Sequence, residues 1–360
     1  MTSPRQSLNS RGMQPFVKLA DPATYVACKW DMRTDHEARS YWIPFFKTHV
    51  RTILRLGGEV LANLGLGADE IERRTHRCTA EFDARFDEFA ARPQSMERVT
   101  ILTLDAWRDQ LLRGHGFDDP FEMLKQRENE TVLPMLPVVL RELDSHTGDD
   151  QILTAVKGVF AGNIFDMGAA ASSKLMLEGG LDFFTTRANL PPRPWLVDDF
   201  DALRQSLSEK QYKKVVYFID NAGADFLLGA LPLMRYLARR GTKVVLAANE
   251  RPTLNDMTVH DVRDWWPRII AAAGCLADLP IEIVSTGTGE PLIDLSSVSD
   301  ELNAAAEDAD LLIIEGMGRA IESNLDAQFA CDALNIGMIK DSMIAKVNGG
   351  KLYDVVLRFR

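Results

Sequence analysis

Between residues 36 and 150 the apolar positions recur at intervals of three and four, the spacing of an amphipathic helix. This half of the chain has few runs of β-branched residues. The pattern predicts almost continuous helix, interrupted at the glycines and prolines between the periodic segments. The expected helical segments are residues 38–64, 69–91, 96–112 and 120–143. The first half of the chain should therefore form a helical bundle or cap.

After about residue 210 the pattern changes to short apolar runs that are rich in β-branched residues, which predict buried strands. The expected strands are 213–219, 243–247, 281–284, 310–314, 336–339 and 352–357, and the helices between most of them 224–240, 259–273, 297–308 and 324–334. This alternation predicts an α/β fold with a mainly parallel sheet and helices on both faces. We expect an N-terminal segment 1–35, a mainly helical domain 36–205 and an α/β domain 206–360.

The composition is that of an ordinary globular protein, because hydrophobic residues make up 46% and charged residues 26% of the 360 residues. With 41 basic and 52 acidic side chains, the net charge is −11. Such a surface would repel a phosphate backbone, so we expect no nucleic-acid partner. A phosphate-bearing ligand must instead meet a local positive site, which a metal ion would supply.

The four cysteines lie far apart and form no CxxC pair, which predicts free thiols in a reducing cytosol. The first ten residues contain no apolar stretch of the kind that a secretory signal needs. The best candidate for a membrane span, residues 269–277, has only nine residues, against the roughly 18 that are required. We therefore expect a cytoplasmic protein with no membrane partner.

Polar residues follow the predicted strands, at the carboxyl ends where open parallel sheets bind ligands. Asp220 and Asn221 come directly after the strand 213–219, and Asp256 lies between the next strand and the helix beyond it. Adjacent strand ends converge, and carboxylate and amide oxygens are the ligands that Mg²⁺ prefers. The three residues could hold a catalytic metal, or they could cap the helices that follow them.

Further candidates follow the same strands. Gly223 lets the backbone approach a ligand, and the N-terminus of the helix after it favours an anion. After the strand 310–314, Arg319 could contact phosphate as a planar fork or form a surface salt bridge. Glu315 and Gly316 precede it, and we expect Glu315 at the mouth of the site.

Two more positions could serve a phosphate ligand. Lys340 follows the strand 336–339 and could neutralise a transferring phosphoryl group, or it could be an ordinary exposed lysine. Asn163 and Asp166 lie three positions apart on one helical face. They could line the crevice and bind substrate from the helical side, or cap a helix.

Motifs of several other enzyme classes are missing. The six histidines form no HExxH pair, and neither GxSxG nor GxxxxGK[ST] occurs. The GxG at residues 316–318 lacks the GxxG continuation of a dinucleotide-binding loop, which disfavours a nicotinamide cofactor.

Several long stretches resemble the damage-control phosphatases, a family long catalogued as domain of unknown function 89. They are DNAGADFLLGALPLMRYLARRGTKVVLAANERPTLNDMT, EGMGRAIESN, GMIKDSMIA, FAGNIFDMG and NLPPRPWLVDD. The similarity runs from about residue 20 to the C-terminus and is most evident to stand-alone plant members and to the phosphatase domain of a pantothenate-kinase-fused branch. The resemblance implies a helical N-terminal part, an α/β C-terminal domain and metal-dependent hydrolysis of small phosphate esters.

The resemblance also implies roles for particular residues. The family's metal ligands fall on Asp220, Asn221 and Asp256, its strand-end lysine on Lys340, and its Glu-Gly-Met-Gly-Arg stretch on residues 315–319. The implied cofactor is a divalent ion, Mg²⁺ or Mn²⁺, with Ni²⁺ or Co²⁺ as alternatives. A CxxC motif found near the start of some branches is missing here.

Together these features predict a divalent-metal phosphatase of a small phosphorylated metabolite, with 4′-phosphopantetheine-like or damaged metabolites as candidate substrates. The nucleophile could be a metal-bound water or Asp220. Phosphatases of the halo-acid-dehalogenase type use Asp-x-Asp, and Ala222 occupies the second position here, which favours water. The alternative is a non-hydrolytic metabolite-binding module or a methyltransferase on the same fold, although DNAGAD supplies only one glycine for a methyltransferase loop.

Overall fold

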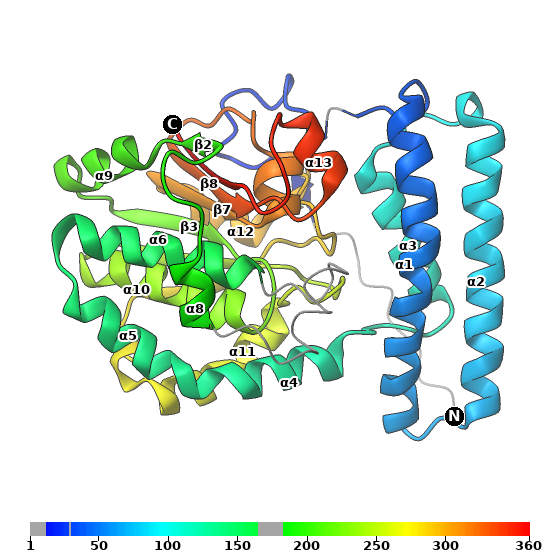
Figure 1. The fold of residues 1–360 in the computed structure, drawn as a ribbon, viewed down its shortest axis with the longest axis horizontal. Coiled ribbons are helices and arrows are strands. Elements are labelled where there is room, and N and C mark those ends of the chain that lie inside the picture. The colour runs from blue at the N-terminus through cyan, green and yellow to red at the C-terminus, as the bar shows by residue number, and fades with distance from the viewer. Residues whose placement is uncertain (1–11, 29, 165–182) are drawn as a thin grey trace.

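The computed structural model describes residues 12–28, 30–164 and 183–360 (Figure 1). The strands of its main sheet are β2 (Val197–Asp198), β3 (Lys214–Phe218), β4 (Lys243–Ala248), β5 (Ile281–Ser285), β7 (Leu311–Glu315), β8 (Asp332–Met338) and β9 (Val355–Phe359). They lie in the order β2-β9-β8-β7-β3-β4-β5. Neighbours run parallel except for β8 and β9, which are antiparallel. Two short strands, β1 (Met13–Gln14) and β6 (Val298–Ser299), form a separate antiparallel pair. The mainly parallel α/β architecture is confirmed.

Helices account for most of the first half of the chain. They are α1 (His36–Asn63), α2 (Ala68–Ala91), α3 (Ile101–Gly114), α4 (Glu122–Val132), α5 (Leu136–Ser145) and α6 (Gly148–Ile164), with 3₁₀ turns at Pro93–Ser95 and Leu133–Met135. In Figure 1, α1 and α2 stand side by side at the right of the molecule, and α4 leads back towards the sheet. Residues 36–150 are all described and contain no strand, so the helical prediction is confirmed.

Helices and turns also connect the strands. They are α8 (Phe183–Ala188), α9 (Phe200–Glu209), α10 (Leu231–Arg239), α11 (Val259–Ala272), α12 (Asp300–Ala306) and α13 (Ser342–Val347), with a 3₁₀ turn at Gly274–Leu276. Two π-helical turns, Asp225–Ala230 and Met317–Ser323, follow β3 and β7, and the first of them continues directly into α10.

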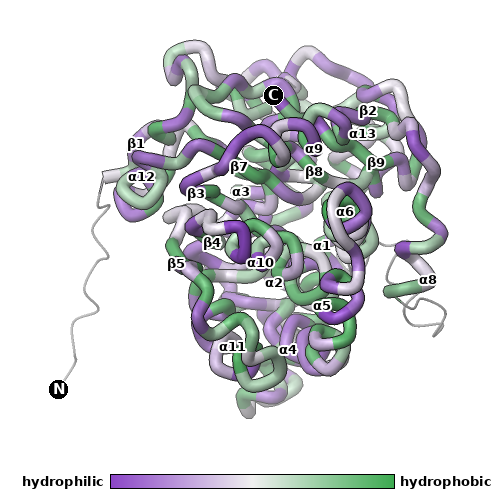
Figure 2. The backbone as a smooth tube through the Cα atoms, turned by 90° about the vertical axis from the view of Figure 1, so that its left-hand side faces the viewer, coloured by the Kyte–Doolittle hydropathy of each residue, from purple (hydrophilic) through white to green (hydrophobic). Residues whose placement is uncertain are grey.

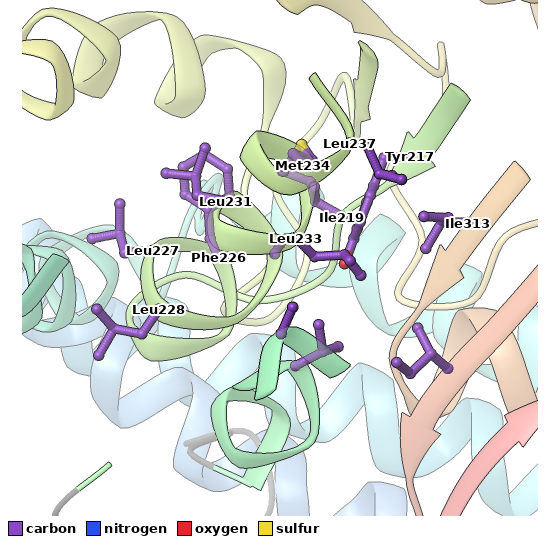
Figure 3. Close-up of a cluster of buried hydrophobic side chains, with 14 of the residues drawn as sticks. Tyr217, Ile219, Phe226, Leu227, Leu228, Leu231, Leu233, Met234, Leu237 and Ile313 are labelled. Atoms are coloured by element: carbon purple, nitrogen blue, oxygen red, sulfur yellow. The ribbon is translucent and has the colours of Figure 1, made fainter. Parts of the chain in front are cut away.

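The sheet separates two buried apolar clusters, because successive strand residues point to opposite faces. On one face Tyr217 packs with Phe226 and Leu233, which come from the π-helical turn and α10 after β3 (Figure 3). On the other face Phe218 meets Phe16, with ring centroids 5.6 Å apart, in a cluster that also contains residues of α1, α2 and α3. Hydrophobic segments accordingly gather around the strands in the middle of the molecule (Figure 2). The helices α1, α2 and α3 therefore pack on one face of the sheet, whereas α5 and α6 pack on the other.

All six predicted strands are present, but the helix predicted over residues 324–334 is wrong. Asp332–Met338 forms β8, which pairs with β7 on one side and with β9 on the other. The residues of β8 after Asp332 are all buried, whichever face of the sheet they point to. The sequence therefore lacks the alternation of apolar and polar residues that marks a half-exposed strand, and it cannot be told from a buried helix by its pattern. The helical turn occurs earlier, at Met317–Ser323, directly after β7.

Chain order and sheet order diverge at β3. The strands β4 and β5 lie on one side of β3, whereas β7 and β8 lie on the other. Such a reversal opens a crevice between the two connections at the carboxyl ends of the strands. The residues that follow β3 and β7 therefore border this crevice.

The structure adds two observations on the chain as a whole. The four cysteines, Cys28, Cys78, Cys275 and Cys331, are free, as expected. Within the described ranges, no helix is both long and apolar enough to cross a membrane.

Candidate active site

A cavity of about 330 Å³ lies beyond the carboxyl ends of the central strands. Asp220, Asn221, Asp256 and Lys340 all line it. A backbone bridge joins Asn221 to Asp256, and the Met257 N–H donates to the carbonyl oxygen of Asp220 at 3.0 Å. The structure therefore brings the three predicted metal ligands and the predicted phosphate-binding lysine to one cavity.

None of the three predicted metal ligands caps a helix, so the capping alternative is wrong. The N-cap of α11 is Thr258, whose hydroxyl accepts from the Asp261 N–H at 3.0 Å. No side-chain cap precedes the π-helical turn after β3. Asp256 instead accepts from Arg319 Nη2 at 2.6 Å and from Asn249 Nδ2 at 3.3 Å.

Arg319 joins the two carboxylates of the site. Its side chain is 2% exposed and forms ion pairs with both Asp220 and Asp256, so the surface salt bridge considered from the sequence is wrong. Arg319 is also not among the residues that line the cavity. Two buried carboxylates this close would repel one another, and the guanidinium offsets that repulsion. Burial still raises the pKa of Asp220 well above its usual range, while the charges of Arg319 and Lys340 oppose the rise.

Hydrogen bonds fix the orientation of the Asn221 amide. Its nitrogen donates to Asp220 Oδ2 at 2.9 Å and to Asp225 Oδ2 at 2.8 Å. Asp225 is buried and also accepts from the Asn221 backbone N–H at 3.2 Å. Because both carboxylates engage the amide nitrogen, the carbonyl oxygen of Asn221 points away from them and remains the atom that can face a ligand.

Asn163 supports this arrangement from α6. Its side chain is fully buried, and its amide nitrogen donates to Asp225 at 3.0 Å and to Asp220 at 3.3 Å. Its backbone oxygen accepts from Lys340 Nζ at 3.0 Å. Asn163 therefore holds two cavity residues in place and does not itself line the crevice, contrary to expectation. Its predicted companion, Asp166, lies outside the described residues.

The two predicted glycines play different parts. Gly316 has φ +100°, and a Cβ at this position would overlap the Asp220 carboxylate, so glycine permits a close approach there. Gly223 has φ +70°, but its N–H donates to Asn129 Oδ1 at 2.7 Å, and a Cβ there would meet Glu128 of α4. Residues of α4 therefore lie beside Gly223 in the structure, and its contact with a ligand stays a prediction.

Glu315 does not lie at the mouth of the site. It is the last residue of β7, is 0% exposed and does not line the cavity. Burial, together with the nearby Asp225 carboxylate, raises its pKa well above the usual range. The expectation that Glu315 lies at the mouth is therefore wrong, and its part in substrate binding stays a prediction.

An ion-pair network that the sequence analysis missed holds the loop after β4. Arg108 on α3 binds Asp105 at 2.6 Å and Asp109 at 2.7 Å, and it donates to Thr253 Oγ1 at 3.0 Å. Thr253 precedes Leu254, which has the left-handed φ of +43° that non-glycine residues rarely adopt. The network thus fixes the backbone that carries Asp256. Thr253 lies 144 and 145 positions after Asp109 and Arg108, so no local motif marks its contact with them.

Glu322 is a further acidic residue that lines the cavity. Burial raises its pKa to about 8, and the Asp105 and Asp341 carboxylates add to the rise. An unfolded glutamate titrates near pH 4.3. Between these two values the folded state keeps a proton that the unfolded state loses, so this group makes the fold less stable as the pH rises.

Glu322→Gln is therefore expected to raise the free energy of unfolding at pH 8, because the amide needs no proton. With EDTA present, we expect a gain of about 1–3 kcal/mol at pH 8 and almost none at pH 4.5, as measured by urea unfolding. Glu72→Gln, at an exposed position of α2, serves as the control and should show no such pH-dependent difference. An equal effect of Glu322→Gln at both pH values would contradict the prediction.

The donor set fits a divalent cation. Within residues 12–28, 30–164 and 183–360, no three His, Cys, Asp or Glu side chains form a metal-binding group by themselves. The predicted set differs, because it combines two carboxylates with the amide oxygen of Asn221. The Asp220 and Asp256 carboxylates reach one guanidinium, so they are close enough to share one cation. Three hard oxygen ligands suit Mg²⁺ or Mn²⁺ and leave positions for water and phosphate.

The sequence matches one family model and is similar to several known proteins. The family model for the damage-control phosphatase ARMT1-like domain matches residues 63–356. A damage-control phosphatase of Arabidopsis thaliana is 44% identical over 256 residues, which cover 70% of each chain. Pantothenate kinase 2 of the same plant is 36% identical over 384 residues, and the 4′-phosphopantetheine phosphatase of Mus musculus is 29% identical over 403. Each of these two matches covers 96% of this chain, which spans only 42% and 49% of the respective relatives.

A solved structure shows the same fold. The duf89 family protein of Pyrococcus horikoshii superposes with a TM-score of 0.63 at 19% sequence identity. The superposition covers 88% of this chain and 96% of that protein.

Proposed function

The chain belongs to the damage-control phosphatase family, as its sequence motifs indicated, and we propose that it is a divalent-metal-dependent phosphatase of small phosphomonoesters. The observation that carries this proposal is the convergence of Asp220, Asn221, Asp256 and Lys340 on one cavity at the switch point of the sheet. This combination offers oxygen ligands for a cation on one side of a phosphate group and a compact positive charge on the other.

The residues of the site would divide the work as follows. Asp220, Asn221 and Asp256 would hold a divalent cation, which when bound supplies a Lewis acid and lowers the pKa of water. Lys340, held by the backbone oxygen of Asn163, would bind a phosphoryl oxygen and offset the charge that develops on it. Arg319 is buried behind the carboxylates, so its role is to position them rather than to contact phosphate.

The contacts of Asp220 favour water as the nucleophile. One of its carboxylate oxygens is paired with Arg319. The other accepts from the side-chain amides of Asn221 at 2.9 Å and Asn163 at 3.3 Å. Both oxygens thus hold the site together as a charged carboxylate, and attack by Asp220 itself would remove the charge that these contacts stabilise.

The alternative function, a methyltransferase or a non-hydrolytic binding module, is less well supported. A methyltransferase needs a glycine-rich loop after its first strand to approach the cofactor. The one glycine of this loop, Gly223, is bonded to Asn129 and faces α4. The candidate substrate comes from the relatives: one is named a 4′-phosphopantetheine phosphatase, and we propose 4′-phosphopantetheine-like esters or damaged metabolites for this chain as well.

A phosphate-release screen tests the proposed function. The full chain is incubated with a panel that includes 4′-phosphopantetheine, phenyl phosphate and several sugar phosphates, each with Mg²⁺, Mn²⁺, Co²⁺ or Ni²⁺. We expect release from at least one ester with at least one metal, and loss of that release in Asp220→Asn. The proposal is wrong if no ester in the panel releases phosphate with any metal.

A further inference from the structure

Aromatic rings from the N-terminal half of the chain also line this cavity. Tyr41, Phe45 and His49, which we call the aromatic stripe, lie four positions apart on α1, so they share one face of the helix. All three line the same cavity as Asp220 and Lys340. A helix from the N-terminal half of the chain therefore faces the site where the phosphate is expected.

The stripe differs from the aromatic core beside it. Trp42 and Phe46, on the neighbouring face of α1, also line the cavity but are only 4% and 3% exposed. Phe45 is 37% exposed and so leaves much of its ring in contact with water. Leu352, from the loop before β9, also lines the cavity and is 43% exposed. Exposed apolar side chains beside a polar site mark a surface that a ligand can cover.

The stripe is ordered and tied to the phosphate side of the cavity. The Tyr41 hydroxyl donates to Asp341 Oδ2 at 2.7 Å, and Asp341 directly follows Lys340. The Tyr41 and Phe45 rings stack with centroids 6.5 Å apart at 10°, and the Phe45 and His49 rings are 5.4 Å apart. A bound molecule would therefore meet a fixed aromatic surface, with little loss of side-chain entropy on binding.

The position of α1 relative to the family domain suggests what the stripe does. The family model matches residues 63–356, so it begins where α1 ends. The strand-end residues lie within this range, and the stripe lies outside it. A wall supplied from outside the residues that the family model matches is suited to selecting the substrate rather than to performing the chemistry of the family domain.

We propose that the aromatic stripe binds the organic part of the phosphomonoester and selects esters with apolar surface next to the phosphate over polyhydroxylated ones. This inference rests on the proposed phosphatase function. An apolar or aromatic group would cover Phe45 and displace weakly held water from it. A sugar would bring several hydroxyls that need partners, whereas the partly exposed ring of Phe45 offers none.

Phe45→Ala tests the proposal, because it removes the ring from a partly exposed position. We expect kcat/KM for phenyl phosphate to fall about tenfold and kcat/KM for glucose 6-phosphate to change less than about twofold. Inhibition provides a second measurement: benzylphosphonate should lose about tenfold in affinity and methylphosphonate should not. Val138→Ala serves as the control, because it removes an apolar side chain of similar exposure, 44%, from α5. It should change neither kcat/KM for the two esters nor the affinities for the two phosphonates.

The outcomes separate the two proposals. If phosphate is released but Phe45→Ala changes both esters equally, the stripe does not select the substrate and the phosphatase function stands. If the wild type releases phosphate from no ester, the proposed function itself is wrong. Phe45→Leu should retain part of the preference, because it keeps an apolar side chain; a complete loss there would also contradict the proposal.

Discussion

Removal of divalent metal ions is expected to abolish phosphate release by this protein, with a loss of roughly 10³-fold or more. Asp220 and Asp256 place two carboxyl groups in the cavity wall, where they would repel an anionic phosphate ester. A bound divalent cation would offset this negative charge and attract the phosphate group. Arg319 pairs with both carboxylates but does not line the cavity, so its charge cannot replace that of the metal. The test is to dialyse the protein against EDTA, confirm by elemental analysis that metal is absent, and measure phosphate release before and after Mg²⁺ or Mn²⁺ is added.

Asp256→Asn tests the same dependence on a divalent metal ion by changing one of the predicted ligands. It keeps the shape of the side chain but removes one charge, so we expect half-maximal activity to need a higher metal concentration. The ion pair with Arg319 is weakened as well, so thermal unfolding should be measured alongside activity. Asp278→Asn, at an exposed position that does not line the cavity, is the control and should leave the metal requirement unchanged. Full activity in protein shown to be metal-free would contradict the prediction.

The position of the site could be predicted from the sequence because parallel strands bring their carboxyl ends to one edge. Asp220, Asp256 and Lys340 follow three different strands and share no local motif, yet the strand pattern was enough to place them together. The helical first half could be predicted for a similar reason, because its apolar spacing is strongly periodic over more than 100 residues.

The direction in which each side chain points could not be predicted in the same way. Glu315 is still part of β7, so its side chain is buried in the fold rather than exposed beyond the strand end. Gly223 was expected to face a ligand, but α4, about 94 positions earlier in the chain, occupies the space beside it. Arg319 appeared to be a surface or phosphate-binding residue because the sequence does not show that two carboxylates surround it. Each of these outcomes depends on packing between distant segments.

The aromatic stripe illustrates the same limit within a helix that was predicted correctly. The spacing of Tyr41, Phe45 and His49 places them on one face of α1, but a helix of this kind has a buried face in any fold. Only the structure shows that this face meets the cavity and leaves Phe45 partly exposed. Periodicity therefore predicts the helix and its faces, and tertiary packing decides which face meets a ligand.

Lys340→Ala is expected to lower kcat/KM by roughly 10²-fold, or about 2.7 kcal/mol of transition-state stabilisation. Lys340 follows β8, lines the cavity with Asp220 and Asp256, and is held through its ammonium group by the backbone oxygen of Asn163 at 3.0 Å. Its charge is therefore fixed before substrate binds and needs little reorganisation as negative charge develops on the phosphoryl oxygens. The measurement is steady-state phosphate release with the best substrate of the screen, together with inhibition by inorganic phosphate.

Two further variants separate this role from a structural one. Lys340→Arg should restore activity only in part, because a planar guanidinium replaces a compact ammonium and cannot keep the same contact with Asn163. Lys346→Ala removes an exposed lysine of α13 that pairs with Glu37, and it should leave kcat/KM unchanged. Thermal unfolding of Lys340→Ala should stay close to that of the wild type, because the buried carboxylates of Asp220 and Asp256 keep Arg319 as their ion-pair partner. Wild-type activity in Lys340→Ala, or a loss fully explained by unfolding, would show that Lys340 does not serve the phosphoryl group.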